Sequence, residues 1–538
     1  MSVSLSKNNS IELPFNSDLV FSSWLQKLAE KDDALKPFIA GFNTIEFAKK
    51  LIENKTYPSH FRKVLCQSLT TQYNQIAIGE AEKKSLNALK NENTFTVTTG
   101  HQLSFAAGPL YFILKAIHTI SLAKEIENKL GVAVVPIFWM ADEDHDFNEI
   151  NHLHFFNSKI GANDLDLNKI PSGDFNTSVF AEAIKLIEEK WGSNQQDIFT
   201  EIKKIYTSNT NLTFATRQLI HFLFGRYGML ALSANDVELK KLAKDLFQKE
   251  FKEQFILSQV NESSNNLVAQ NIIPENKLQA KARAINFFYY DDGLRNKVEI
   301  ENGNVILGNG KEFLISEFEN LLKSNPENVS PNVFFRPLYQ ELILPNIAYI
   351  GGGAEVSYWL QLAKSFAAAS IQMPMIIQRN SVLPIERKLY DKFLTFGFTT
   401  VDLLKPSGEL VKIFLEKNSE DISLENQKLE LTNLFVQILE QAKLVDVTLQ
   451  GSVEAEKVKS IAGLNNLEQK INKAQKLKFE QQTKQIQKTS ERIKPQGVLN
   501  ERVDSGIQYL SRNGLYFLDQ LLEISQPWGF SLKILVID

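Results

Sequence analysis

Two short segments of the sequence carry side chains suited to catalysis or ligand binding. The first, "TTGHQLSFAAGP", begins at Thr98 and places His101 and Gln102 between Gly100 and Gly108. Glycines let a backbone approach a ligand closely, and His and Gln donate hydrogen bonds to a phosphate or to a developing oxyanion. The segment predicts a ligand-binding loop, although a glycine pair of this spacing is also typical of a plain strand-to-helix turn.

The second segment, "DEDHDFNE", runs from Asp142 to Glu149 and is dense in carboxylates. So many carboxylates can bind an ammonium group, hold Mg²⁺, or raise one another's pKa toward that of a general base. A solvated acidic loop has the same composition, but this one directly follows a buried apolar run that ends at Trp139 and Met140. We therefore expect it to form part of a site.

A third segment, "GGGAEVSYW", combines a triple glycine with Glu355 and Tyr358. It lacks the GxGxxG spacing, and Arg379 stands where a nicotinamide-binding fold has an acidic residue, so a dinucleotide site of that kind is disfavoured. Arg336 and Gln340 come just before this segment, and a guanidinium can clamp a carboxylate or a phosphate.

Composition and missing motifs exclude several classes of protein. The chain has no Walker loop, no GxSxG and no clustered cysteines. Its net charge of −4 gives no global field for nucleic acid or an anionic membrane. Its longest apolar run, residues 132–141, is roughly half the length that crosses a bilayer. Because Cys66 is the only cysteine and no signal peptide is evident, we expect a cytoplasmic protein.

The spacing of apolar residues predicts a βαβ unit around the first two segments. "TFTVTT" (94–99) has the β-branched composition of a strand, residues 109–130 repeat with helical period, and "VAVVPIFWM" (132–140) is typical of a buried strand. Such units cross over with one hand, so the two segments open at the same edge of the sheet and face one cleft.

Further alternation predicts the rest of the core. Buried runs at 228–234, 347–353 and 373–379 extend the pattern to an α/β fold with a Rossmann-like, doubly wound parallel sheet. Ligands of such sheets bind beyond the carboxyl ends of the strands. Asp-Gly and Asn-Gly turns within 283–313 predict hairpins, which we interpret as insertions that decorate the sheet.

A seven-residue repeat follows the core. Leu424, Leu431, Ile438 and Val445 are spaced by seven, and a second series runs to Ile493, so two long helices form an antiparallel coiled-coil arm. Two helices leave apolar surface exposed, which predicts a homodimer. The expected domains are a core at 1–385 with connecting-peptide insertions near 150–215 and 267–325, the α-helical coiled-coil arm at 386–494, and a C-terminal segment at 495–538 that returns to the core.

Several long motifs, in this order, resemble one known family. "TGHQLSFAAGPLYFILKAI", "VVPIFWMADEDHDFNEI", "RPLYQELILPNIAYIGGGAEVSYWLQL" and "GVLNERV" are similar to the cysteine-adding enzymes of bacillithiol biosynthesis, essentially along the whole chain. The resemblance implies a core like that of class I aminoacyl-tRNA synthetases, with a coiled-coil dimerisation arm. It also implies a ligase that adds L-cysteine to glucosaminyl malate, by an amide bond, in the last step of the pathway.

The cofactor is left open by the residues. Amide formation from a carboxylate needs activation, normally by ATP or another nucleotide with Mg²⁺, but the first loop has one His followed by Gln in place of the His-Ile-Gly-His pattern of class I synthetases. Cysteine that arrives already activated is the alternative. Two other functions compete with the ligase: a non-catalytic dimeric scaffold with a relic cleft, and a metal-dependent hydrolase that uses Asp142, Asp144 and His145.

The expected site lies within the matched motifs. The expected catalytic residues are His101, Asp144 and His145. The residues expected to bind substrate are Gly100, Gln102, Ser104, Gly108, Asp142, Glu143, Asp146, Arg336, Gln340, Gly352, Gly353, Glu355, Tyr358 and Arg379. No resident metal, no nucleic acid and no membrane partner is expected.

Overall fold

The computed structural model describes residues 9–13, 21–162, 170–208, 210–418 and 423–538. Internal contacts divide the chain into two compact units. The core unit holds the residues up to 384 together with 498–535, and the second unit holds 385–497 with 536–538. None of the described helices is long and apolar enough to span a membrane.

The core unit is organised by a sheet of five parallel strands. These are β2 (Thr94–His101), β3 (Ala133–Met140), β6 (Leu230–Ser233), β12 (Asn346–Gly351) and β13 (Met375–Gln378). Their order is β13-β12-β2-β3-β6, so the chain proceeds outward from β2 in one direction and later fills the other side. This order confirms the Rossmann-like α/β fold, and its switch point lies between β2 and β12.

Helix α5 (Tyr111–Leu130) crosses over from β2 to β3 and ends at Gly131, whose φ of 68° is the left-handed conformation that glycine adopts readily. The helix begins two residues later than the proline at its predicted start. Pro109 instead forms an isolated bridge with Ser505, and the next amide, of Leu110, donates to the carbonyl of Asp504 at 2.8 Å. Pairing with the distant C-terminal segment therefore holds Pro109 outside the helix.

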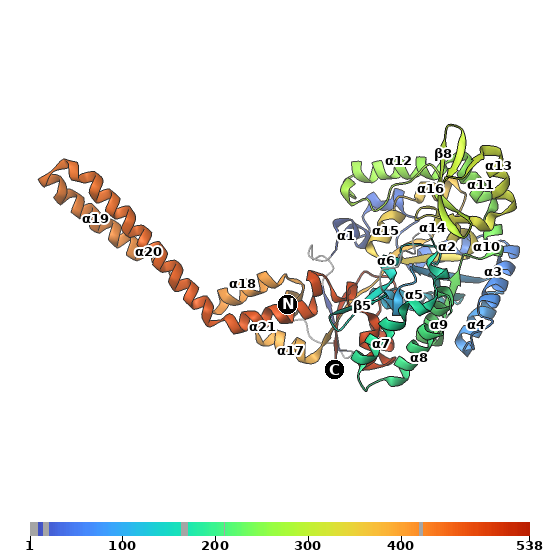
Figure 1. Ribbon diagram of the computed structural model, residues 1–538, viewed down its shortest axis with the longest axis horizontal. Helices are drawn as coiled ribbons and strands as arrows, with labels where there is room; N and C mark the ends of the chain where they lie inside the picture. Colours follow the sequence, from blue (N-terminus) through green and yellow to red (C-terminus); the bar gives the residue numbers. More distant parts are fainter. Residues whose placement is uncertain (1–8, 14–20, 163–169, 209, 419–422) are drawn as a thin grey trace. The chain divides into compact units, whose positions relative to one another are not determined.

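Helices and hairpins surround the sheet (Figure 1). The segment before the sheet forms α1 (Ser23–Ala29), α2 (Ile45–Asn54), α3 (Ser59–Gln72) and α4 (Glu80–Ala88). Between β3 and β6 lie α6 (Phe147–Ile150), the hairpin β4 (His152–Phe155) and β5 (Ser158–Gly161), then α7 (Ala181–Trp191), α8 (Gln196–Thr207) and α9 (Leu212–Phe224). After β6 come α10 (Val237–Leu242), α11 (Lys244–Glu253) and α12 (Phe255–Ala269).

The second insertion is an antiparallel sheet, as its turn residues predicted. Strands β7 (Phe287–Asp291), β8 (Leu294–Glu301), β9 (Asn304–Leu307), β10 (Glu312–Leu314) and β11 (Val329–Pro331) pair in the order β10-β9-β8-β7-β11. Gly293 and Gly303 occupy the two tight turns with φ of 74° and 81°, a conformation that a side chain disfavours. The hairpins are therefore confirmed. Helices α13 (Ile315–Ser324) and α14 (Phe335–Ile343) lead to β12.

The remaining elements of the core unit come from two parts of the sequence, one directly after β12 and one after the second unit. Helices α15 (Gly353–Trp359) and α16 (Ala363–Ala368) connect β12 to β13, and β14 (Ser381–Glu386) follows. Near the end of the chain, α22 (Gly506–Asn513) and α23 (Tyr516–Ile524) precede β15 (Leu532–Ile537). β15 pairs with β1 (Ser10–Leu13) in antiparallel register.

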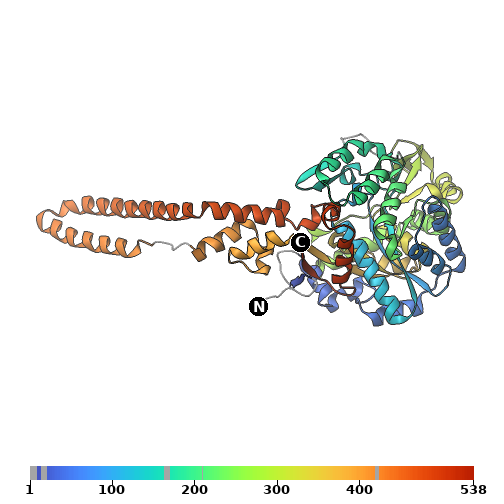
Figure 2. The same cartoon turned by 90° about the horizontal axis from the view of Figure 1, so that it is seen from below.

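The second unit is helical, as the heptads predicted. Helices α19 (Glu425–Val445) and α20 (Gln450–Lys478) lie side by side as an antiparallel hairpin in both views (Figures 1 and 2). An ion pair of 2.6 Å between Lys428 and Glu468 joins them. No residue of α19 is buried, because a two-helix hairpin covers only one side of each helix. The unit also contains α17 (Arg387–Thr395), α18 (Ser407–Asn418) and α21 (Glu480–Ile493).

We predict that Leu122→Ala lowers the free energy of unfolding of the core unit by about 2–5 kcal/mol, because it opens a cavity in the core. Leu122 lies on α5 and is fully buried against β2 and β12. Leu314→Ala is the matched control: Leu314 is 55% exposed in the same unit, and we expect a change below about 0.5 kcal/mol. Urea unfolding followed by circular dichroism measures both; equal losses would contradict this description of the core.

Candidate functional site

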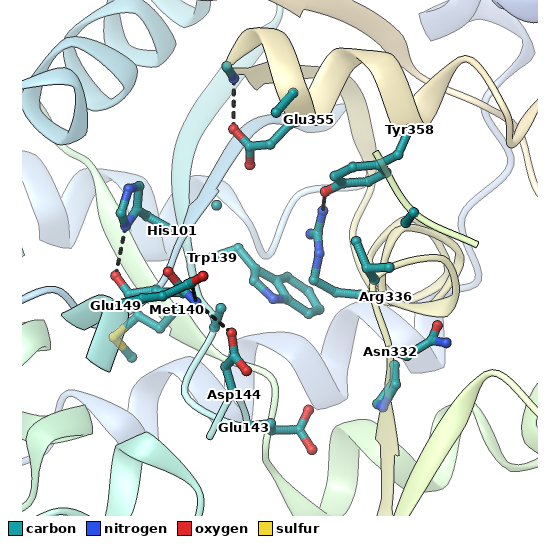
Figure 3. Close-up of a pocket in the computed structure, with 18 of the residues that line it drawn as sticks. His101, Trp139, Met140, Glu143, Asp144, Glu149, Asn332, Arg336, Glu355 and Tyr358 are labelled. Carbon is teal, nitrogen blue, oxygen red and sulfur yellow. Dashed lines mark hydrogen bonds between the residues drawn. The ribbon is translucent and has the colours of Figure 1, made fainter. Parts of the chain in front are cut away.

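A cavity of about 930 Å³ lies at the carboxyl ends of the central strands, beside the switch point between β2 and β12 (Figure 3). Its walls are rich in charge. Seven cationic side chains line it: Lys115, Lys281, Arg283, Arg295, Arg336, Arg379 and Arg502. Five carboxylates line it: Asp142, Glu143, Asp144, Glu149 and Glu355. A cavity with excess positive charge, in a chain of net charge −4, favours an anionic ligand.

The glycine-bounded loop and the acidic loop meet in this cavity. The Gln102 amide donates to Asp144 Oδ2 at 2.7 Å and to Glu149 Oε2 at 2.6 Å. The backbone amide of Ala141 also donates to the carbonyl of His101 at 3.0 Å. The expectation that the two loops face one cleft is confirmed. Gln102 holds two mutually repelling carboxylates side by side.

His101 is half-buried. Its ring packs against Tyr111 and Phe112, with centroids 5.4 and 5.1 Å away. Nδ1 lies 2.9 Å from the carbonyl of Gln102, which only accepts, so Nδ1 carries the hydrogen and Nε2 keeps its lone pair. In the described part of the chain no hydrogen-bond partner reaches Nε2.

Burial, together with the nearby charge of Lys115, lowers the pKa of His101 to about 4. The ring is therefore neutral at physiological pH. His101 is suited to accept a hydrogen bond or a proton at Nε2, whereas the sequence predicted a hydrogen-bond donor to a phosphate or an oxyanion.

His145 has the opposite arrangement. Arg295 donates from Nη1 to His145 Nδ1 at 2.9 Å, and a guanidinium cannot accept, so the imidazole hydrogen lies on Nε2. Burial and the charge of Arg295 both lower the pKa of His145. As a neutral ring whose lone pair is occupied, His145 can donate a hydrogen bond to a ligand. It is not placed to act as a general base.

A buried ion pair fixes the glycine loop after β12. Lys115, on α5, lies 2.6 Å from Glu355 Oε2 and donates to the carbonyl of Gly100 at 2.5 Å. The Gly352 amide donates to the same carboxylate at 2.7 Å. Burial alone would raise the pKa of Glu355, but Lys115 outweighs it and holds that pKa below its usual value. Glu355 thus positions the loop and is no free ligand group.

Arg336 is the cation best prepared for an anionic ligand. Its Nη1 donates to Gln340 at 2.8 Å, and its Nη2 donates to the Tyr358 hydroxyl at 3.1 Å. The guanidinium also lies 5.9 Å from the centroid of Trp139. In the part of the chain that the structure describes, no carboxylate lies within 4.0 Å of it. Figure 3 shows Arg336 and Tyr358 on one side of the cavity and His101 on the other.

Arg379 differs from Arg336 although both line the cavity. Its Nη2 lies 2.8 Å from Glu501 Oε1, and both side chains are buried. The pair is electrically neutral, so Arg379 is not the free anion clamp that its position after β13 suggested.

The two carboxylates nearest β3 are also occupied. Asp142 Oδ2 accepts hydrogen bonds from Ser233 at 2.5 Å and from Thr213 at 3.2 Å. Glu143 Oε1 lies 2.6 Å from Lys240 Nζ. Nowhere in the described residues do three His, Cys, Asp or Glu side chains converge on one metal position. The set Asp142, Asp144 and His145 is not arranged as the hydrolase alternative requires.

Four expected site residues are not among those that line the cavity: Ser104, Gly108, Gln340 and Asp146. Gly108 has φ of 50°, and its carbonyl accepts from the Gly506 amide at 3.4 Å; Ser104 is buried behind it. Gln340 is fully buried, and its side-chain oxygen accepts the hydrogen bond from Arg336. Asp146 is exposed at the start of α6.

Other lining residues were not singled out from the sequence: Tyr111, Lys115, Lys281, Arg283, Arg295, Asn332 and Arg502. Two of them offered a local signal: Lys115 interrupts the apolar run "PLYFILKAIHTISLA", and Arg502 lies within the motif "GVLNERV". The others come from α5 and from the residues between β6 and α14, and the fold brings them to the cavity.

Comparisons with known proteins cover the whole length of the chain. The model of "Bacillithiol biosynthesis BshC, N-terminal Rossmann-like domain" matches residues 9–380, and that of its "C-terminal coiled-coil domain" matches 382–537. The chain is 35% identical to "Putative cysteine ligase BshC" of Flavobacterium johnsoniae, over 96% of this chain and 98% of that one. Proteins of the same name from Cytophaga hutchinsonii and Bacillus cereus (strain B4264) are 31% and 29% identical, covering 96% and 87% of this chain and 96% and 89% of theirs.

The buried carboxyl group of Asp142 should make the free energy of unfolding depend on pH. Burial raises its pKa to about 6, so between pH 4 and 6 the folded chain binds more protons than the unfolded chain. The free energy of unfolding therefore falls as pH rises through that window, by roughly 1–3 kcal/mol from this group. Asp142→Asn removes this fall.

The measurement is urea unfolding of wild type and variant at several pH values. We expect the difference in unfolding free energy, variant minus wild type, to rise between pH 4 and 6 and to level above. Asp146→Asn, on the exposed part of the same loop, is the control. A difference for Asp142→Asn that does not change with pH would refute the assignment.

Proposed function

The chain belongs to the BshC family of bacillithiol biosynthesis, and we propose that it is a ligase that joins L-cysteine to glucosaminyl malate through an amide bond in the cavity. One observation carries the choice of site: an arginine without a carboxylate partner faces a neutral histidine and a pair of carboxylates across one cavity. These groups match the charges of a dicarboxylate, an amine and an amino acid.

Arg336 holds the malate part of the acceptor. Its planar fork can donate two parallel hydrogen bonds to one carboxylate, and Gln340 and Tyr358 keep the fork in place. Lys281 and Arg283 also line the cavity, and neither has a carboxylate within 4.0 Å among the described residues. They are available to the second malate carboxylate.

Asp144 and Glu149 hold the ammonium group of cysteine. Gln102 brings their oxygens to one nitrogen at 2.7 and 2.6 Å, and each carboxylate keeps further lone pairs for a ligand. A cation placed between them relieves their mutual repulsion. This supports the amino-acid substrate at the acidic loop.

The reaction requires that the amine nitrogen of glucosaminyl malate attack the activated carboxyl carbon of cysteine. A C–N bond forms, the C–O bond to the leaving group breaks, and the nitrogen loses a proton. His101 Nε2 accepts that proton, because attack makes the N–H acidic and the neutral ring has a free lone pair there. Activation by ATP or another nucleotide with Mg²⁺ stays a prediction.

We predict that His101→Ala or Asp144→Asn, returned to a strain that lacks this protein, leaves bacillithiol low and glucosaminyl malate accumulated. The first change removes the proton acceptor, and the second weakens the ammonium site. Mass spectrometry of cell thiols measures both compounds. A rate loss of roughly 100-fold or more is expected for His101→Ala.

Asp146→Asn is the matched control for Asp144→Asn, because Asp146 lies in the same loop, is exposed and does not line the cavity. It should restore normal thiol levels. Normal levels in well-expressed His101→Ala and Asp144→Asn variants would favour the scaffold alternative and would refute the site.

The coiled-coil hairpin supports a homodimer as part of the same proposal. Outside the seam, α19 and α20 expose large apolar side chains, among them Leu434, Val436 and Leu467 at 50, 51 and 48%. Covering such surface is favourable by about 25 cal/mol per Å², opposed by the cost of association. A second copy of the same hairpin is the partner that two-fold symmetry provides.

We expect Leu434→Glu combined with Leu467→Glu to convert the dimer to a monomer of 61.1 kDa, because each charge would be buried in the contact. Light scattering coupled to gel filtration reads the mass. Glu430→Gln with Lys470→Gln, at exposed polar positions of the same helices, is the control and should stay dimeric. A double Glu variant that remains dimeric would place the contact elsewhere.

A further inference from the structure

The segment Val498–Ser505 contains all but the first residue of the motif "GVLNERV", and none of its residues has a role in the proposed reaction. It belongs to the core unit, and its residues Asn500–Arg502 form a 3-10 turn. Asn500 Nδ2 donates to the carbonyl of Pro384 at 2.9 Å, and both residues are in that same unit. The turn is therefore fixed to the chain that follows β13.

Glu501 fixes the turn more strongly. It is fully buried, and it accepts from Arg379 at 2.8 Å, from the Ser381 hydroxyl at 3.1 Å and from the Val382 amide at 3.0 Å. Hydrogen bonds to a buried charge are the strong ones, and together they determine the backbone direction at the next residue. The negative charge of Glu501 also cancels the positive charge of Arg379.

Arg502 is the next residue, and its environment is different. It is exposed, it lines the cavity, and no carboxylate lies within 4.0 Å of it in the described residues. It lies on the side of Tyr111, because Glu501, the preceding residue, binds Arg379, and the Arg379 guanidinium lies 5.3 Å from the centroid of the Tyr111 ring. Tyr111 packs on His101, so Arg502 stands on the His101 side of the cavity.

The cavity thus has free cations on two sides. Arg336 lies beside Trp139 and Tyr358, whereas Arg502 follows Glu501 on the side of the cavity where Arg379, Tyr111 and His101 pack together (Figure 3 labels Arg336, Trp139, Tyr358 and His101). A guanidinium fixed at its backbone and without a protein partner is suited to pair with an oxyanion of the ligand. Two such cations on opposite sides indicate two separate anionic groups.

We propose that Arg502 binds the oxyanion of the acyl donor: the carboxylate of cysteine, or the phosphate group that the donor carries once activated. The inference rests on the proposed function, in which Arg336 holds the acceptor. It follows because the carbon that is attacked must lie near His101, where the amine proton is accepted, and Arg502 is the free cation on that side. Glu501 is then a positioning residue, which orients Arg502 and keeps Arg379 from competing for the anion.

The test is calorimetry with the purified full chain and three probes: L-cysteine, inorganic phosphate and glucosaminyl malate. Arg502→Gln should weaken binding of cysteine, phosphate or both by about tenfold or more, the usual effect of a charge-assisted hydrogen bond, and leave glucosaminyl malate within about twofold. Arg502→Lys keeps the charge and should recover part of the loss. Arg492→Gln, an exposed arginine of α21, is the matched control and should bind like wild type.

The outcomes separate the two sources of the anion. A loss confined to cysteine identifies the carboxylate, and a loss confined to phosphate identifies the activated donor. Unchanged cysteine and phosphate binding in Arg502→Gln, or wild type that binds neither probe, overturns the inference. A loss confined to glucosaminyl malate also overturns it, because Arg502 would then hold the acceptor.

Failure of glucosaminyl malate to bind wild type contradicts the proposed function instead, and the phosphate arm still tests Arg502. Thermal unfolding separates the two neighbouring residues. Arg502→Gln should leave the melting temperature unchanged, since its side chain is exposed and without an ion-pair partner in the described chain. Glu501→Gln should lower it, because Arg379 would be left buried without its carboxylate.

Discussion

The contact between Lys115 and Glu355 spans the point where β2 and β12 lie side by side, and the cavity depends on it. Lys115 Nζ binds both the Gly100 carbonyl at the end of β2 and the carboxylate that accepts from the Gly352 amide after β12. Burying two charges costs several kcal/mol each, and their attraction offsets this only with good geometry. Such a pair contributes most by fixing the two loops relative to each other.

Some charged residues that line the cavity are paired with an opposite charge of the protein, and others are left for a ligand. Glu143 with Lys240 and Arg379 with Glu501 are pairs whose charges cancel, so these residues hold strands and loops together. Arg336 and Arg502 have no such carboxylate among the described residues. A charge in a protein wall is costly unless it is paired, and a ligand of opposite charge supplies the missing partner. We therefore propose these unpaired arginines as the positions where anions bind.

The two histidines illustrate how a neighbour sets the chemistry of a ring. A carbonyl beside Nδ1 of His101 leaves Nε2 as an acceptor, whereas a guanidinium beside Nδ1 of His145 leaves Nε2 as a donor. Both rings are neutral because burial and nearby cations lower their pKa values. Two residues that look equivalent in the sequence thus have complementary capacities, one to accept a proton and one to donate a hydrogen bond.

The sequence by itself determined the strands, the crossover helix, the hairpin turns and the heptad helices, because these follow from periodicity and from the conformations of glycine and proline. It also determined that the His101 loop and the acidic loop share an edge, since a parallel βαβ unit leaves little choice of topology. The helix start was predicted two residues early, because Pro109 bridges to Ser505, 396 positions further along the chain.

Only the tertiary structure decided which charged residues are free to bind a ligand. Asp142, Glu143, Glu355 and Arg379 looked available, but each has a partner between 71 and 240 positions away in the chain, and no local pattern encodes such pairs. Arg502 was brought to the cavity for the same reason: Glu501 binds Arg379 within the core unit, although the residues of the second unit lie between them in the sequence. Ion pairing depends on distances in space, and the sequence gives those distances only through the completed fold.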